Sequence, residues 1–393
     1  MVTMTSADKA LKTLYLGVVT DQLNTEINPL LAKIKQSTAD VWGKEIRRIA
    51  RYGINGGIGA GTETGELPTA AGSNFEQFVT TLKNLYGTIE ISDKAMRASQ
   101  NNAGAFVNLL NEEMESLLKA ATFNFGRMLF GDGSGILART TAANAASAPN
   151  VISCDGVKNF VEGMLVDVLD TQGESLELGL RRVTYIDRAA KTITLGGSAL
   201  SAGDVVKDAI IVVQGSYKNE LTGLGAIFKS TGSIYGLSRD THKWLVPYMK
   251  TDVGAISETV IQKAIDELDE HAGSKVNFIV CSSGVKRAFM KHLATYKRNC
   301  DVMDLAGGYK ALSYNGIPII SDRFCPDGTM YLLNTDDFTL HQLCDWKWLE
   351  GEDGKVIKQI AGRPTYAATL VKYADLICAR PCGQAMLSGI TEE

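Results

Sequence analysis

The sequence predicts an α+β fold made of one long helix, a glycine-tipped β arm and an inserted small all-β domain. Three observations support this. Apolar residues recur at three- and four-residue steps over 102–129, two strand-like segments flank a glycine-rich run at 53–72, and short strands alternate with turns over 151–214. Mixed α/β patterning follows residue 215, so the chain divides into several structural parts.

Composition excludes several classes of protein. Hydrophobic residues make up 45% of the 393 residues, enough for a sizeable core, and the formal net charge is −4. This balance argues against a general basic surface for nucleic acid, which needs clustered lysine and arginine. The seven cysteines lack paired spacing, so we expect free thiols in a reducing compartment. We also expect neither a signal peptide nor a membrane span, since no apolar run is long enough.

The first segment, 11–34, has roughly helical apolar spacing that Pro29 interrupts. It carries more apolar side chains than a free tail needs. It either docks onto its own body or a neighbouring subunit, or forms an ordinary first helix, and the pattern does not separate these readings.

The β arm is expected from residue 44 to residue 92. Lys44–Tyr52 is strand-like with charges on both faces, and Phe75–Ser92 is rich in β-branched and aromatic residues. The intervening tip is crowded with glycine and contains Pro68. A long two-stranded arm is marginal alone, so we expect it to lie on an external surface.

The long helix is expected over 102–129, more than twice the mean helix length of a globular protein. One face is apolar, the opposite face is charged or polar, and Gly131, Gly133 and Gly135 end it. The apolar face carries Phe106, Leu110, Met114, Leu117, Ala121, Phe125 and Met128.

After the helix, small polar residues over 138–149 predict a linker, and the strands of 151–214 predict a small barrel or sandwich that includes Val205–Val206. The mixed region then predicts helices at 256–271 and 285–296. Strands are expected at 277–281, 317–321, 330–334, 338–343 and 368–378.

No catalytic, cofactor or metal site is predicted. The glycine run 53–61 lacks the Lys-Ser/Thr pair and following helix of a phosphate loop. Cys378, Cys382 and His341 lack a matching second pair for zinc. Ser282 or Ser283 would need a histidine that the fold brings near, and the acidic cluster 266–270 reads as a solvated helix face.

The order of elements, together with particular runs, resembles the major capsid protein of tailed bacteriophages, with the Hong Kong 97 (HK97)-like fold. Gly43-Lys44 opens the arm, Glu66-Leu67-Pro68 lies at its tip, and the run 86–91 (Tyr-Gly-Thr-Ile-Glu-Ile) closes it. The run 129–137 (Leu-Phe-Gly-Asp-Gly-Ser-Gly-Ile-Leu) looks like the coat-protein segment that follows the spine helix. The resemblance covers 11–138 well and is topological afterwards.

The resemblance implies a role for each segment. Residues 1–43 would be the N-arm, 44–92 the extended hairpin called the E-loop, and 93–150 the peripheral (P) domain with its spine helix. Residues 151–214 would be the inserted β domain, 215–243 a P-domain connection, 244–350 the axial (A) domain, and 351–393 a P-domain strand and tail. Contacts between subunits would involve residues of the N-arm and E-loop: Tyr15, Leu23, Leu30, Arg47, Arg51, Glu63, Glu66, Leu67, Pro68, Phe75 and Phe78.

The implied function is an icosahedral virion shell of hexamers and pentamers that encloses double-stranded DNA without reading its sequence, assembled in the host cytoplasm. Implied partners are a separate scaffolding protein, a portal protein at one vertex and a decoration protein, with no membrane and no cofactor. Some members crosslink a hairpin lysine to an asparagine, but nothing marks Lys83 or Lys94 as reactive, so crosslinking is not predicted.

Three alternatives stay open. An encapsulin shell shares the fold, although its subunits typically lack so large a β insertion. The region 277–322 could belong to an α/β enzyme with the β insertion as a substrate lid. Such an enzyme would show a pocket with convergent polar groups. A tail-tube or baseplate polymer fits the single long helix poorly.

Overall fold

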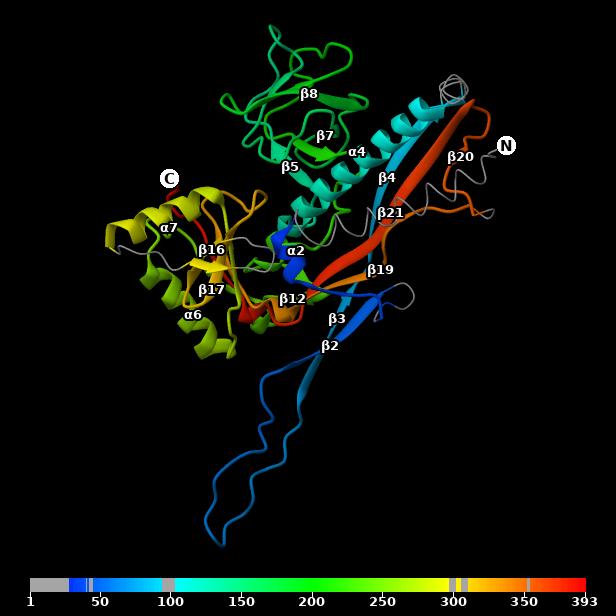
Figure 1. Cartoon of the computed structure of the whole chain (residues 1–393). Helices are drawn as coiled ribbons and strands as arrows, with labels where there is room; N and C mark the ends of the chain where they lie inside the picture. The colour runs from blue at the N-terminus through cyan, green and yellow to red at the C-terminus, as the bar shows by residue number, and fades with distance from the viewer. Residues whose placement is uncertain are drawn as a thin grey trace. The chain divides into compact units, whose positions relative to one another are not determined.

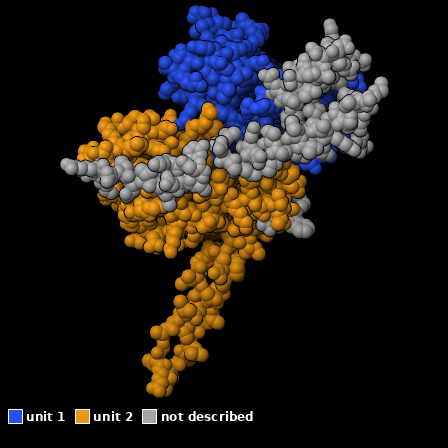
Figure 2. Space-filling view, viewed as in Figure 1, with its two compact units in different colours: residues 1–28, 83–226, 346–371 blue, residues 29–82, 227–345, 372–393 orange. Residues whose placement is uncertain are grey.

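The computed structural model describes residues 28–39, 41, 45–93, 103–296, 302–304, 310–351 and 354–393, with side chains omitted for 103–112, 296, 302–304, 310 and 311. The chain forms two compact units. Unit 1 comprises 1–28, 83–226 and 346–371, and unit 2 comprises 29–82, 227–345 and 372–393 (Figure 2). The predicted N-terminal segment, with Tyr15 and Leu23, lies outside the described residues up to Ile27.

Unit 1 is built on the long helix α4, Ala103–Phe130, which confirms the helix expected over 102–129 (Figure 1). Its 28 residues span about 42 Å at 1.5 Å per residue. Glu113, Glu115 and Lys119 are exposed, while Met114 and Leu118 are buried, as an amphipathic helix requires. The final turns, from Phe125 to Phe130, are buried on every side.

Strand β4, Lys83–Ser92, lies against α4. Gly87 makes this approach close, because a Cβ at that position would come within 3.0 Å of a Leu117 methyl group. The expected strand 75–92 is therefore two strands: β3, Asn74–Thr80, stays in the arm, while β4 pairs with β21, Thr365–Cys378. The break at residues 81–82 separates an exposed arm from a packed strand.

The inserted all-β domain is a six-stranded barrel in unit 1. Its strand order is β5-β10-β7-β8-β9-β6. An isolated bridge between Thr140 and Cys154 joins the two end strands, supported by the Thr141 N–H donating to the Ser153 carbonyl at 2.9 Å. The strands are β5 Ile136–Arg139, β6 Val151–Ser153, β7 Leu165–Leu169, β8 Arg181–Asp187, β9 Thr192–Leu195 and β10 Ile210–Val213.

The barrel encloses its own core, which includes Phe160, Val183 and Ile193. The linker expected over 138–149 is wrong, because the barrel begins at Ile136 and includes Asn144. The Asn144 side chain donates to the Pro149 and Ser201 carbonyls at 2.9 and 2.8 Å and accepts from the N–H groups of Gly203 and Val205. The polar composition of 138–149 resembles that of a linker. The Asn144 amide, however, bonds backbone groups that no strand pairs. The strand expected at Val205–Val206 is also wrong, since both residues lie in the loop between β9 and β10.

Unit 2 is built on a mixed seven-stranded sheet, in the order β13-β22-β18-β14-β17-β16-β15. The helices and strands expected between 256 and 334 are confirmed there. The strands are β13 Tyr248–Lys250, β14 Phe278–Cys281, β15 Val302–Asp304, β16 Lys310–Tyr314, β17 Ile317–Ser321, β18 Met330–Leu333 and β22 Ala385–Leu387. Helix α6, Glu258–Ala272, contacts β13 and β22, and helix α7, Ser283–Tyr296, contacts β17.

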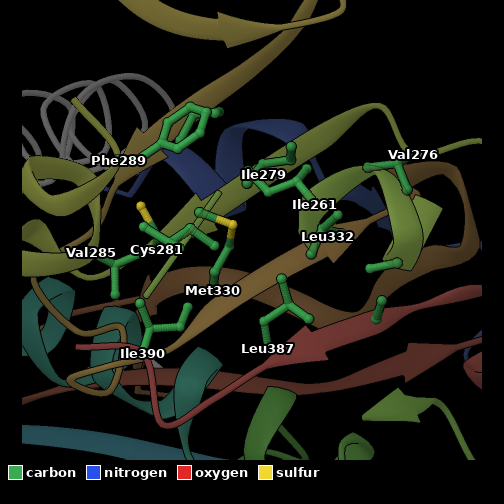
Figure 3. Packing of buried hydrophobic residues seen from close by; sticks show 14 of the residues in the cluster. Ile261, Val276, Ile279, Cys281, Val285, Phe289, Met330, Leu332, Leu387 and Ile390 are labelled. Atoms are coloured by element: carbon green, nitrogen blue, oxygen red, sulfur yellow. The ribbon is translucent and has the colours of Figure 1, made fainter. Parts of the chain in front are cut away.

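A cluster of buried apolar side chains lies between these helices and the sheet. Figure 3 shows Ile261 of α6 and Phe289 of α7 with Ile279, Leu332 and Leu387 of the strands. Ser257 caps α6 by accepting from the Val260 N–H, and Gly273 ends it in the left-handed conformation at φ 55°. The local sequence signals thus agree with the tertiary packing.

The remaining elements are short, apart from β2 and β19. They are α2 Pro29–Lys33, β1 Lys35–Ser37, β2 Ile46–Tyr52, α5 Leu224–Ile227, β11 Ser233–Ile234, β12 Leu237–Ser238, β19 Phe338–Trp348 and β20 Lys358–Gln359, with 3₁₀ turns at Lys243–Leu245, Thr335–Asp337 and Pro381–Gly383. A second sheet has the order β1-β19-β21-β20, with β4 also paired to β21. In the described chain no helix combines the length and apolarity needed to cross a bilayer.

Candidate functional site: the exposed hairpin

The hairpin of β2 and β3 is highly exposed among the described residues of unit 2, and Figure 1 shows it extending from the unit as a narrow ribbon. The two strands pair antiparallel from Ile46 opposite Thr80 to Tyr52 opposite Asn74. Beyond them, residues 53–73 form no strand. The arm predicted from the glycine-rich pattern is therefore present, with its ladder confined to the base.

An aromatic cluster anchors that base to unit 2. Phe78 is 1% exposed, with its ring centroid 5.3 Å from Tyr235 and 5.9 Å from Trp244. The Tyr52 ring stacks on Trp244 at 5.2 Å and 7°. These contacts bury one face of the two-stranded ribbon, which would be marginal without them.

Hydrogen bonds fix the same end of the arm. The Val79 N–H donates to the Tyr235 carbonyl at 2.9 Å, and the Thr80 hydroxyl donates to the buried Asp375 carboxylate at 2.6 Å. The Tyr235 hydroxyl in turn accepts from the Cys378 N–H and donates to the Leu376 carbonyl. Burial raises the pKa of Tyr235 well above its ordinary value, which further favours the neutral hydroxyl that makes both bonds.

The tip, by contrast, has almost no contact with its own chain. Every residue from 53 to 73 is exposed except Gly57, which is partly buried. Two local hydrogen bonds shape it: the Gly57 N–H donates to the Asn55 side chain and the Gly65 N–H donates to the Thr62 carbonyl. Gly53, at φ 65°, turns the chain out of β2.

Large apolar side chains lie uncovered along the whole arm. Their exposed fractions are 70% for Ile49, 77% for Ile54, 76% for Ile58, 90% for Leu67 and 61% for Phe75. Single exposed apolar residues are common on proteins, but a series along one projecting element marks an interaction surface. The arm therefore has the chemistry of a contact that the isolated chain does not complete.

The contact residues expected from the sequence fall into three groups. Arg47, Arg51, Glu63, Glu66, Leu67, Pro68 and Phe75 are exposed on the hairpin, and Arg47 is held by Glu45 at 3.1 Å. Phe78 and Leu30 are buried by their own chain, so neither side chain has surface to offer another subunit. Tyr15 and Leu23 lie outside the described residues.

Sequence reasoning missed the residues that hold the arm in place. Trp244 and Tyr235 lie more than 150 residues from the hairpin in the chain, and no local pattern links them to Phe78. The aromatic residues Phe75, Phe78 and Tyr52 around the glycine tip were the available signal. The pattern could not tell which of them is exposed.

Ser282 and Cys378 have structural surroundings. The Ser282 hydroxyl donates to the Glu392 carboxylate and accepts from the Val285 N–H, so it caps α7. Burial raises the pKa of the Cys378 thiol, which disfavours the thiolate needed for metal binding. Within the described residues, no three His, Cys, Asp or Glu side chains gather as a metal site.

Comparison with known proteins finds similarity in structure but none in sequence. No protein-family model matches the sequence, and no curated protein matches it. The structure, however, resembles solved shells along nearly its whole length. The cyanophage A-1(L) capsid asymmetric unit aligns with a TM-score of 0.56 at 12% identity, covering 94% of this chain and 94% of that chain.

Two further structures align less closely. The capsid of Myoviridae phage XM1 gives a TM-score of 0.48 at 9% identity, over 93% of this chain and 92% of that one. The holo-SrpI encapsulin complex from Synechococcus elongatus gives 0.45 at 10%, over 95% of each chain. The likeness to the cyanophage structure shows a fold shared with a phage capsid protein. More particularly, the chain has the HK97-like fold expected from its sequence, with an all-β domain inserted in it.

Proposed function

We propose that this chain is the major capsid protein of a tailed bacteriophage, which self-assembles into the icosahedral head that encloses double-stranded DNA. One observation carries the proposal: a chain with a capsid fold projects a hairpin whose apolar side chains its own units leave exposed. An enzyme arm of this length would need a substrate or a second domain to cover Ile54, Ile58 and Leu67.

The parts of the chain have the following roles in this proposal. The hairpin 46–80 is the arm that reaches a neighbouring subunit, and α4 is the spine of the P domain. The mixed sheet of unit 2 is the A domain, and the barrel, 136–213, is an insertion on the P domain. The barrel favours a phage head over an encapsulin, whose subunits typically lack an insertion of this size.

Copies of the chain would form hexamers and pentamers. Repetition of one modest arm contact around a closed shell gives a stable particle by multivalency. The net charge of −4 suits a container that packages DNA without holding its phosphates fast. A separate scaffolding protein, a portal at one vertex and a decoration protein complete the proposed virion, assembled in the host cytoplasm, with no catalytic role for this chain.

Electron microscopy of the purified protein tests the proposal. The wild-type chain, expressed alone and with candidate scaffolding proteins, should form closed particles in negative stain. Replacing 54–72 by a short glycine linker should abolish particles yet leave a folded protein with unchanged circular dichroism and melting temperature, because these residues bury nothing in their own chain.

A matched control separates arm loss from general damage. Tyr185→Ser alters a barrel side chain that is 58% exposed, and should leave particle formation intact. Particles formed without the hairpin tip would contradict the arm assignment, and so would a deletion variant that unfolds. A monomeric wild-type chain that converts a small molecule would support the enzyme alternative instead.

A further inference from the structure

The chain contains the dipeptide Asn-Gly twice, at 55–56 and at 315–316. This pair is chemically reactive in a peptide. The backbone nitrogen that follows the asparagine can attack the side-chain amide carbon, and glycine has no Cβ to hinder that approach. Both asparagines are exposed, so exposure alone does not distinguish them. Their backbone surroundings do.

Asn315 is held in a closed turn of unit 2. It follows β16 and precedes β17, where Tyr314 pairs with Ile317, and Asn315 and Gly316 have φ angles of 50° and 78°. Two residues with positive φ form the tight hairpin turn for which Asn-Gly is preferred. The Asn315 side-chain N–H also donates to the Gln262 side-chain oxygen at 3.2 Å. Ring closure fixes the rotation of the asparagine backbone, so attack at this position requires the turn and this bond to open.

Asn55 has no such restraint on its backbone. It lies beyond the last pair of the hairpin ladder, Tyr52 with Asn74, and the segment 53–73 forms no strand. Among the described residues no acceptor holds the Gly56 N–H. The backbone can therefore rotate toward the geometry that ring closure needs without breaking a ladder, and the attacking nitrogen is available.

The Asn55 side chain is also placed for the reaction. Its amide oxygen accepts a hydrogen bond from the Gly57 N–H at 2.9 Å. This bond folds the side chain back over the Gly56 peptide unit, which lies between the two bonded groups in the chain. A donor on a carbonyl oxygen also stabilises the negative charge that develops there when a nucleophile attacks the carbon. The tip thus provides both an unhindered nitrogen and an activated amide.

We propose that Asn55 is a site of spontaneous deamidation. The Gly56 nitrogen loses its proton to hydroxide and bonds to the Asn55 amide carbon. The bond from that carbon to the side-chain nitrogen then breaks, and this nitrogen takes a proton from water and leaves as ammonia. Water opens the resulting cyclic imide at one of its two carbonyls, which gives aspartate or isoaspartate. Water is the only co-reactant consumed, and nothing is oxidised or reduced.

The product changes the tip in charge and in backbone length. Residues 53–73 contain Glu63 and Glu66 and no lysine or arginine, so an ionised carboxylate at position 55 adds to an already acidic segment. Isoaspartate also inserts one extra carbon into the main chain. Under the proposed function a tip seated on a neighbouring copy is covered, so the reaction takes place in chains that have not assembled.

Peptide mapping by mass spectrometry tests the proposal on the purified, unassembled full chain, incubated at neutral and at mildly alkaline pH. The peptide that contains Asn55 should gain the mass difference between an OH and an NH₂ group, and an isoaspartyl methyltransferase should label it. Conversion at Asn55 should be about tenfold faster than at Asn315 or more, which corresponds to about 1.4 kcal/mol in the barrier. It should be faster at the higher pH, because the attacking nitrogen must first lose its proton.

Gly56→Ala is the matched variant. Gly56 lies outside the left-handed region, and an added Cβ would meet the Ala71 Cβ at 3.5 Å, an ordinary contact, so the tip accepts alanine without strain. The added Cβ hinders attack by the backbone nitrogen, so conversion at Asn55 should slow by about tenfold while conversion at Asn315 stays unchanged. Equal rates at the two asparagines, or a rate at Asn55 that Gly56→Ala does not alter, would overturn the proposal.

Assembled particles separate this inference from the proposed function. If a neighbouring copy covers the tip, conversion at Asn55 should be slower in particles than in free chains. Conversion that is equally fast in both would support the modification and contradict the arm contact. Free chains that keep Asn55 intact as long as Asn315 would overturn the modification and leave the shell proposal standing.

Discussion

The barrel and the hairpin are both made of short β-strands, but the barrel pairs its sheet edges and buries its apolar side chains, whereas the hairpin tip does neither. The barrel joins β5 to β6 through the Thr140–Cys154 bridge and surrounds its own core. The hairpin leaves both edges of its tip unpaired and exposes Ile54, Ile58 and Leu67. The barrel is complete within one chain, whereas the hairpin requires another surface.

Phenylalanines make the contrast quantitative. Phe160 in the barrel and Phe78 at the hairpin base are each 1% exposed, while Phe75, three residues from Phe78, is 61% exposed. Truncating a side chain that its own chain buries should lower the unfolding free energy. Truncating an exposed side chain of the arm should instead lower the yield of assembled particles. The two classes of residue can therefore be separated by experiment.

The largest effect is expected for Phe160→Ala. Removing a fully buried aromatic ring from the barrel core should cost about 3–5 kcal/mol of unfolding free energy, since the small barrel cannot collapse around the cavity. Thermal and denaturant unfolding of the full chain, followed by barrel-specific hydrogen exchange, measure it. A loss below about 1 kcal/mol would mean that the barrel is not a packed body.

A smaller loss is expected for Asn144→Ala. The change leaves the Pro149 and Ser201 carbonyls and the Gly203 and Val205 N–H groups without their side-chain partner, at about 1–3 kcal/mol for an unsatisfied buried group. We expect about 2–3 kcal/mol in chemical denaturation, with Asn219→Ala on an exposed turn as the control. No change would restore the linker interpretation of 138–149.

The smallest effect on folding is expected for Phe75→Ala. The side chain is mostly exposed, so the unfolding free energy should stay within about 0.5 kcal/mol of wild type. Particle yield in light scattering should nevertheless fall, because the arm loses part of its apolar face. Equal loss of stability and assembly would show that Phe75 packs on its own chain and would weaken the contrast with Phe78.

Much of the fold was predictable because its signals are local. The apolar period of α4, the cap and glycine of α6, and the glycine crowding of the arm depend on residues within a few turns of one another. The expected helix ends at Leu129 and the observed one at Phe130. The presence of the arm follows from the same kind of pattern, although the burial of Phe78 does not.

The errors share one cause, which is that partners distant in sequence decided the outcome. Asn144 looks like a linker residue until Ser201 and Val205 supply its hydrogen bonds. The segment 75–92 has the pattern of one strand, but its second half, β4, pairs with β21 while its first half, β3, pairs with β2. Phe78 resembles Phe75 until Trp244 covers it.

The amino-acid sequence by itself determined the long helix, the glycine-tipped arm and the presence of an all-β insertion, because periodicity and turn chemistry act over short distances. Only the tertiary structure decided which apolar residues the chain buries, where the barrel closes, and that Arg127 and Glu220 form a buried pair. Burial and pairing depend on residues that are close in space but far apart in the chain.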